Sequence, residues 1–263
     1  ICAEIFGDID KDTVDFADNY DATMKEPALL PCAFPNILVN PNQGIAVGMA
    51  SNIASFNLKE VCEAAAAYLK NPDTDLLQHL PAPDFSTGAL LLYDEDEMRQ
   101  IYRTGRGSFR LRAVYQYDKK NNCIEITQIP YNTTLEAILD KLVELIRAGK
   151  VREIADLRDE TDLGGLKLTL DLKRGTDPDK LMTRLYKLTD LQCSFSCNFN
   201  LLVDQRPVVL GVAGILGEWT RFRMDCVRRG LRYDIAKKTD KLHLLQGLAK
   251  ILLDIDKAIS IIR

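Results

Sequence analysis

Few residues of this chain could carry out bond-making chemistry unaided. The two histidines, His79 and His243, lie far apart in the sequence. The chain contains no Gly-x-Ser-x-Gly or His-Glu-x-x-His motif, the patterns typical of esterases and zinc proteases. Cys193 and Cys197 lie four residues apart, but no second pair is present to complete a zinc site. The sequence therefore disfavours a self-contained hydrolase or metalloenzyme.

The acidic N-terminal segment resembles a calcium loop only superficially. Asp8, Asp10 and Asp12 alternate as in an EF-hand, but that pattern then needs glycine where Thr13 stands and glutamate where Asn19 stands. We expect a short acidic helix capped by Asp12 or Thr13, followed by an extended segment. We expect this chain to bind no metal.

A run of arginines is the strongest candidate for ligand binding. The run comprises Arg99, Arg103, Arg106, Arg110 and Arg112, and no acidic residue lies between Glu97 and Asp118. The period of two in a strand places Arg110 and Arg112 on one face. Gly105 and Gly107 predict a flexible corner whose backbone N–H groups are free to donate to phosphate oxygens. The guanidinium group of arginine is suited to bidentate contacts with phosphate. The alternative is a solvated strand face.

Composition and charge narrow the classes of protein. The chain has 263 residues, of which 46% are hydrophobic and 27% charged, as in ordinary globular proteins. The net charge of −4 hides an imbalance of −12 over residues 1–100 and +8 over residues 101–263, which favours an anionic partner over one part of the chain. Seven cysteines, an odd number, indicate a reducing compartment, and no apolar run is long enough to span a bilayer.

The pattern along the chain predicts an α+β fold, with mixed strands and helices followed by a helical C-terminal arm. Turns are expected at 41–44 and 119–122, one continuous strand at 108–117, a strand at 166–173 and a strand pair over 198–210. Helices are expected at 58–70 with Asn57 as N-cap, 95–102, 133–149 with a Thr133/Glu136 capping box, 179–191 and from 217 onward. Basic residues over 221–241 fit the salt-bridged surface of that last helix.

Several longer motifs resemble one protein family. They include Gly44-Ile-Ala-Val-Gly-Met-Ala-Ser-Asn-Ile, Tyr102-Arg-Thr-Gly-Arg-Gly and Leu157-Arg-Asp-Glu-Thr-Asp. In order and spacing these resemble the A subunit of bacterial type IIA DNA topoisomerases, that is, DNA gyrase or topoisomerase IV. The resemblance covers essentially the whole chain.

The resemblance implies a DNA-gate fragment. It assigns 1–35 to the end of the breakage–reunion (winged-helix) region, 36–215 to the tower, and 216–263 to the long helix of the coiled-coil arm with part of the exit-gate dimerisation region. Family members cut, pass and reseal duplex DNA with a tyrosine in an Arg-Tyr-Thr/Ser-Glu motif. None of the nine tyrosines here lies in that motif. The fragment should therefore be inactive alone, lacking that tyrosine and the C-terminal DNA-wrapping domain.

The resemblance also implies the DNA-binding residues. Ile53, beside Asn52, would be a wedge between base pairs of a bent gate duplex. Phe56 stands where the family usually has histidine, and an alternative is that Phe56 also packs near the DNA. The family's usual prolines after the wedge are replaced here by Ala54 and Ser55, which leaves the rigidity of this loop open. The local alternative is that Ile53 is a buried residue at a strand end. The resemblance places the basic corner 99–112 in the tower. Our own hypothesis, beyond the resemblance, is that Arg103, Arg106, Arg110 and Arg112 contact phosphates flanking the bend.

The implied partners are duplex DNA, another copy of the A subunit, and an ATP-hydrolysing B subunit, together forming an A2B2 assembly. Mg²⁺ and ATP would act through the B subunit, and this chain would bind no cofactor. The implied location is cytoplasmic and nucleoid-associated. Two other readings stay open: a non-enzymatic architectural DNA-binding protein of the same fold, and an α+β protein with a coincidental basic patch. Gyrase and topoisomerase IV are not separated by these residues.

Overall fold

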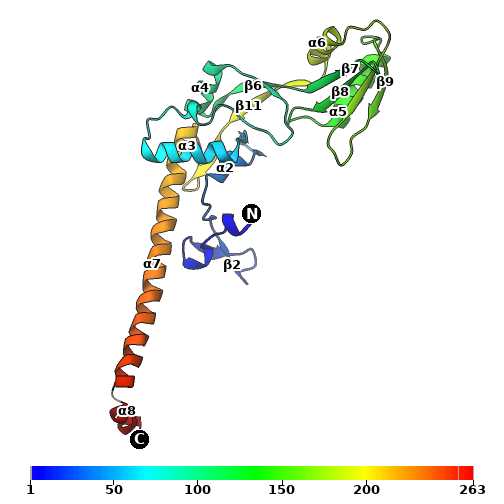
Figure 1. Ribbon diagram of the computed structural model, residues 1–263. Helices are drawn as coiled ribbons and strands as arrows, with labels where there is room; N and C mark the ends of the chain where they lie inside the picture. Colours follow the sequence, from blue (N-terminus) through cyan, green and yellow to red (C-terminus); the bar gives the residue numbers. More distant parts are fainter. Residues whose placement is uncertain (1, 254, 263) are drawn as a thin grey trace. The chain divides into compact units, whose positions relative to one another are not determined.

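The computed structural model describes residues 2–253 and 255–262 and falls into two compact units (Figure 1). Unit 1 comprises residues 1–35 and 217–263, and unit 2 comprises residues 36–216. Helices and antiparallel sheets are mixed, which confirms the predicted α+β class. The resemblance implies domain boundaries at 35/36 and 215/216, and the units divide at 35/36 and 216/217.

Unit 1 contains a small N-terminal hairpin and most of a long helix. Its elements are α1 (Cys2–Ile5), the 3-10 turn η1 (Ile9–Lys11), β1 (Phe16–Asp18), β2 (Lys25–Pro27), α7 (Val212–Leu253) from residue 217 on, and α8 (Ile255–Ile262). The predicted acidic helix capped by Asp12 or Thr13 is wrong. Asp12 is left-handed at the end of η1, and its carboxylate and carbonyl both accept from Arg229 of α7. Arg229 also pairs with Asp15 at 2.8 Å.

Unit 2 is built on a five-stranded antiparallel sheet in the order β3-β4-β11-β6-β5. Its strands are β3 (Asn42–Ala46), β4 (Met49–Ile53), β11 (Gln192–Asn198), β6 (Arg106–Arg112) and β5 (Leu90–Leu92). The helices of this part are α2 (Asn36–Val39), α3 (Leu58–Lys70) and α4 (Glu95–Thr104), with the 3-10 turn η2 (Leu76–Gln78) between α3 and β5. Apolar side chains such as Phe109, Leu111 and Phe195 bury one face of the sheet. The other face is largely solvent-exposed along β6 and β11.

Unit 2 contains a second antiparallel sheet, which has four strands in the order β7-β8-β10-β9. Its elements are β7 (Val114–Asp118), β8 (Cys123–Gln128), β9 (Ile154–Asp159) and β10 (Leu168–Leu172), with α5 (Leu135–Arg147) and α6 (Pro178–Leu188). Apolar residues of both helices pack with the inner face of this sheet in one buried cluster. The hairpin of β12 (Asn200–Val203) and β13 (Arg206–Val209) then leads to α7.

Local signals predicted many of these elements correctly. Asn57 caps α3, its side chain accepting from the Lys59 N–H, and the 119–122 turn joins β7 to β8. The cap of α5 is Thr134 rather than Thr133. The expected continuous strand at 108–117 is wrong, because Ala113 is fully buried and donates its N–H to the Leu191 carbonyl, so β6 and β7 enter different sheets.

Candidate nucleic-acid interface

The outward face of β6 and β11 is polar and cationic. These strands pair along their full lengths, and alternate residues share a face because directly paired side chains point the same way. We call the outward set the arginine face: Arg106, Ser108, Arg110 and Arg112 of β6 with Gln192, Ser194, Ser196 and Asn198 of β11. Neither strand contains an acidic residue. The face therefore offers donors and positive charge to an anionic ligand.

Two arginines on this face are available for a ligand. Arg106 and Arg110 are exposed, and within the described part of the chain neither forms an ion pair. Asp94 and Glu97 line the same shallow depression as Arg110 without pairing with it. Arg112 is already engaged, because its Nε donates to Gln192 Oε1 at 2.8 Å and its guanidinium lies 4.7 Å from the centre of the Tyr186 ring. We therefore separate Arg106 and Arg110 from Arg112, which holds the sheet against α6.

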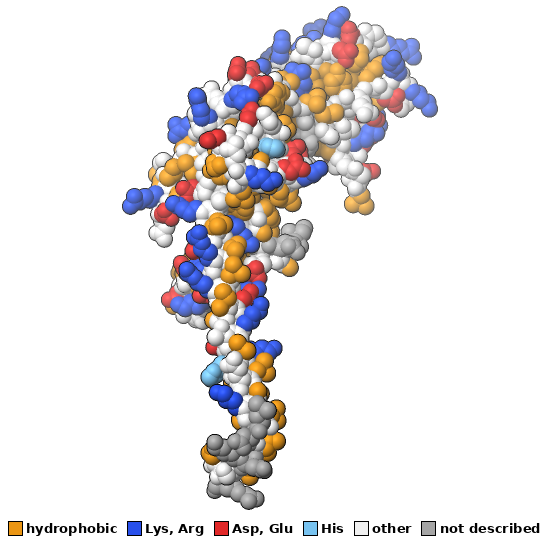
Figure 2. Space-filling view, turned by 60° about the vertical axis from the view of Figure 1, so that its left-hand side comes forward, with side chains coloured by type: hydrophobic (Ala, Val, Ile, Leu, Met, Phe, Trp, Pro, Cys, Tyr) orange, Lys and Arg blue, Asp and Glu red, His pale blue; other side chains and the backbone are white. Residues whose placement is uncertain are grey.

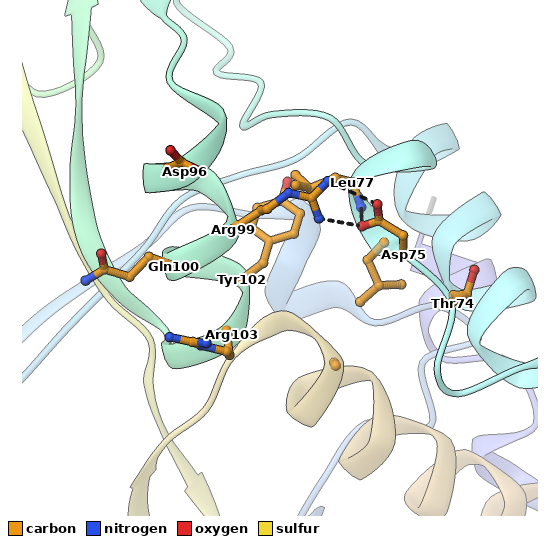
Figure 3. Close-up of a pocket in the computed structure, with 10 residues that line it drawn as sticks. Thr74, Asp75, Leu77, Asp96, Arg99, Gln100, Tyr102 and Arg103 are labelled. Atoms are coloured by element: carbon orange, nitrogen blue, oxygen red, sulfur yellow. Dashed lines mark hydrogen bonds and ion pairs between the residues drawn. The ribbon is translucent and has the colours of Figure 1, made fainter.

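Arg103 and Arg99 lie on α4 beside a separate pocket of about 600 Å³ (Figure 3). Arg99 pairs with Asp75 at 3.2 Å and with Glu95 at 2.8 Å, so it is not free to bind phosphate. Arg103, in the last turn of α4, is exposed and points away from the Arg99–Asp75 pair in Figure 3. Of these two arginines, Arg99 therefore serves in structural ion pairs, whereas Arg103 remains an exposed cation.

The corner between α4 and β6 is tightly held, which corrects the expectation of a flexible loop with free N–H groups. The Gly105 N–H donates to the Ile101 carbonyl at 2.7 Å, and the Arg106 N–H donates to Thr104 Oγ1 at 3.2 Å. Gly105 has a φ of 71°, and a Cβ there would lie 2.2 Å from the Leu210 carbonyl oxygen. Glycine is needed at this corner for close packing, because the neighbouring backbone occupies the space of a side chain.

Ile53 does not project from the molecule. Its exposure is 0%, which matches the alternative of a buried residue at the end of β4 and leaves no exposed side chain to enter a base step. Asn52 donates its side-chain N–H to the Ser196 carbonyl at 2.6 Å, tying β4 to β11. Phe56 is also buried and packs edge-on against Tyr102. The Ser55 hydroxyl donates to the Asp84 carbonyl, so the segment is held without the prolines.

An exposed isoleucine that the sequence analysis missed lies on the same hairpin. Ile45 is 88% exposed on β3, next to Val47 in the turn. The register pairs Ile45 with Ala50, Gln43 with Asn52, and Asn52 with Asn198, which belongs to the arginine face. Ile45 therefore lies on the arginine-face side of the sheet. The expected turn at 41–44 is wrong: the chain reverses at Val47 and Gly48, where Gly48 has a φ of 77°.

Tyr102 and a cluster of three candidate metal ligands lie in the described part of unit 2. Burial raises the pKa of Tyr102, and its hydroxyl donates to the Leu80 carbonyl. Within the described residues, the candidate ligands that come together are Asp118, Cys123 and Glu125. Burial, followed by the nearby carboxylates, raises the pKa of the Cys123 thiol, and Lys167 pairs with Glu125. A thiol beside one ion-paired and one hydrogen-bonded carboxylate does not fit Mg²⁺, which prefers oxygen ligands.

Comparisons with known proteins agree with the motifs. The sequence profile of one family, the A subunit of DNA gyrase/topoisomerase IV, matches residues 1–263. The chain belongs to this family. The DNA gyrase A subunit of Chlamydia muridarum is 40% identical over 97% of this chain, and that of Streptomyces coelicolor is 40% identical over 99%. That of Borrelia hermsii is 40% identical over 100%. The chain spans 32%, 31% and 33% of these relatives, respectively, or about a third of their length.

Among the described residues, none of the helices combines the length and apolar character needed to cross a membrane.

Proposed function

We propose that this chain is part of the DNA gate of a type II topoisomerase, within its A subunit, and that its arginine face lies along the backbone of the gate duplex. Family membership over the whole chain supports the parent activity. The observation that carries the residue-level proposal is the face itself, where exposed Arg106 and Arg110 lie among serine and asparagine side chains with no acidic residue on either strand. Such donors suit phosphate oxygens and carry no base specificity.

Ile45 is the residue that we propose as an apolar wedge. It stands almost fully exposed on a two-stranded ribbon, on the same side as the arginine face. Inserting an apolar side chain between base pairs costs a few kcal/mol of stacking and kinks the duplex. Smooth bending costs roughly 1–6 kcal/mol, so phosphate contacts on the arginine face would offset it. The resemblance gives this role to Ile53, which is 0% exposed in this structure, and variants of the two isoleucines distinguish the two assignments.

The parent protein would carry out ATP-dependent breakage, passage and rejoining of duplex DNA as an A2B2 assembly. The partner B subunit would supply ATP hydrolysis and Mg²⁺, because the one candidate metal cluster among the described residues of this chain does not suit that ion. The nucleophilic tyrosine would come from another part of the parent, since none of the tyrosines here lies in the family motif. The expected location is the cytoplasm, on the nucleoid.

The test is the salt dependence of DNA binding by the full-length protein. Each phosphate contact contributes about 0.9 to the slope of log affinity against log salt concentration. The Arg106→Gln/Arg110→Gln variant should lower the slope by about 2 per protomer. Lys59→Gln/Lys70→Gln, which removes the same charge from exposed sites on α3, is the matched control and should leave it unchanged. Equal slopes for wild type and the arginine variant would refute the proposal.

A cleavage assay separates the enzyme from an architectural DNA-binding protein. The full-length protein combined with its B subunit should cut and relax supercoiled DNA. Binding and bending without any cleavage would favour the architectural alternative.

A further inference from the structure

A second cationic surface lies at the far end of the four-stranded sheet. It is a hollow of about 590 Å³ formed by the segment before β9, the turn between β10 and α6, and the first turns of α6. We call it the anion pocket, and its basic lining residues are Arg152, Lys173, Arg174, Lys180 and Arg184. Figure 2 shows basic side chains gathered around this outer end of unit 2. None of the residues that line the pocket belongs to the run of arginines between Arg99 and Arg112.

The positive charge of the anion pocket is only partly neutralised from within. Its two acidic residues are already occupied: Glu153 pairs with Arg184, and Asp177 caps α6 and pairs with Lys180 at 3.3 Å. The Arg184 side chain holds the pKa of Glu153 below its usual range, so that carboxylate stays ionised and paired.

Arg152, Lys173 and Arg174, the other three cations of the pocket, form no ion pair with a carboxylate among the described residues. Lys173 and Arg174 are exposed. The Arg152 side chain instead donates to the Gly149 carbonyl at 3.1 Å. In addition, the Nε of Arg184 is buried and has no acceptor. Three unneutralised cations and one unsatisfied donor in a single hollow favour an anionic ligand with several oxygen atoms.

Helix α6 connects this pocket to the arginine face. At one end of α6, Tyr186 packs under Arg112 of that face and donates its hydroxyl to the Ala113 carbonyl at 3.0 Å. Pro178, at the other end, is eight residues earlier, which is about 12 Å along a helix. Both surfaces belong to unit 2 (Figure 1). The pocket residues of this segment run from the N-cap Asp177 to Arg184, so the anion pocket starts near Tyr186 and Arg112 and extends toward the N-terminal end of α6.

We propose that the anion pocket binds a backbone phosphate of the same duplex, past the Arg112 end of the arginine face. The proposal rests on the proposed function, because it extends the DNA track that starts at β6. The arginine face is about 20 Å long, or about six base-pair steps. Only a duplex arm long enough to pass the arginine face would reach the pocket.

The experiment uses the full-length protein with its B subunit, and duplexes of about 16 to about 40 base pairs. Lys173→Gln/Arg174→Gln removes two exposed charges that have no ion-pair partner, so folding should be unaffected, which a melting curve checks. The variant should bind the shortest duplexes like wild type. On the longest ones it should lose affinity several-fold, with a salt slope lower by about 1 to 2 per protomer. Lys59→Gln/Lys70→Gln is again the matched control.

A small phosphate compound could offer the same oxygen atoms to the anion pocket as the DNA backbone does. Pyrophosphate binding is therefore measured by calorimetry in parallel. Pyrophosphate binding that Lys173→Gln/Arg174→Gln abolishes, without any length-dependent loss of DNA affinity, would overturn the DNA assignment. An equal loss on short and long duplexes, or no loss on either, would also overturn it. Failure of the proposed function is distinguishable, because in that case Arg106→Gln/Arg110→Gln would leave the salt slope unchanged on every duplex.

Discussion

Truncating the two isoleucines of the β3–β4 hairpin should separate stability from DNA bending. Ile53 is 0% exposed, so Ile53→Ala removes a fully buried side chain and should cost about 2–5 kcal/mol of folding free energy. For a unit of this size each kcal/mol lowers the melting temperature by about 2–4 °C. The melting transition of this unit should therefore fall by at least about 4 °C. Ile45 is 88% exposed, and Ile45→Ala should change stability by no more than about 0.5 kcal/mol.

The effects on DNA should be reversed. Fluorescence energy transfer between the ends of a labelled duplex reports its bend when the full-length protein binds. Ile45→Ala should reduce the bend, because no apolar side chain would remain to hold the unstacked step open. Ile53→Ala should bend DNA normally below its melting temperature. Val47→Ala is the matched control for loss of an exposed apolar side chain in the same hairpin.

Two results would refute this reasoning. If Ile45→Ala bends DNA as wild type does, the wedge is not Ile45. If Ile53→Ala abolishes bending while its melting temperature is unchanged, Ile53 is not the core residue that its burial indicates.

Three further predictions concern the stability and reactivity of unit 2 and α7. Burial and neighbouring carboxylates raise the pKa of Glu60, so Glu60→Gln should raise the melting temperature at pH 7, and the gain should shrink as the pH falls below the ordinary range of glutamate, where both the folded and the unfolded chain bind the proton. Burial raises the pKa of the Cys197 thiol to about 12, so a thiol reagent at pH 8 should label exposed Cys62 and spare Cys197 until denaturation. Gly105→Ala should cost at least about 1 kcal/mol, whereas Gly247→Ala on α7 should be neutral or stabilising.

Features encoded by neighbouring residues could be predicted from the sequence. The Asn57 cap and the 119–122 turn depend on side-chain and backbone preferences within a few positions, and both occur where expected. The alternation that placed Arg110 and Arg112 on one face is likewise local, and the buried Phe109 and Leu111 confirm it.

Features that depend on distant partners could not be predicted in this way. The pattern at 41–44 resembles a good turn, but β3 continues through Gly44 and the reversal comes at Gly48. With the turn expected at 41–44, the sequence did not indicate that Ile45 is an exposed residue near the end of a hairpin strand. The segment that follows Ile53 is fixed by a residue distant in the sequence, because the Phe56 N–H donates to the Leu38 carbonyl. A nearest-neighbour pattern contains no information on that contact.

The most direct measurement is a structure of the full-length protein bound to a bent duplex. We predict phosphate oxygens within hydrogen-bonding distance of the Arg106 and Arg110 guanidinium groups, and the Ile45 side chain between two base pairs. A duplex on the opposite face of the five-stranded sheet, with Ile45 away from any base, would contradict the proposed function.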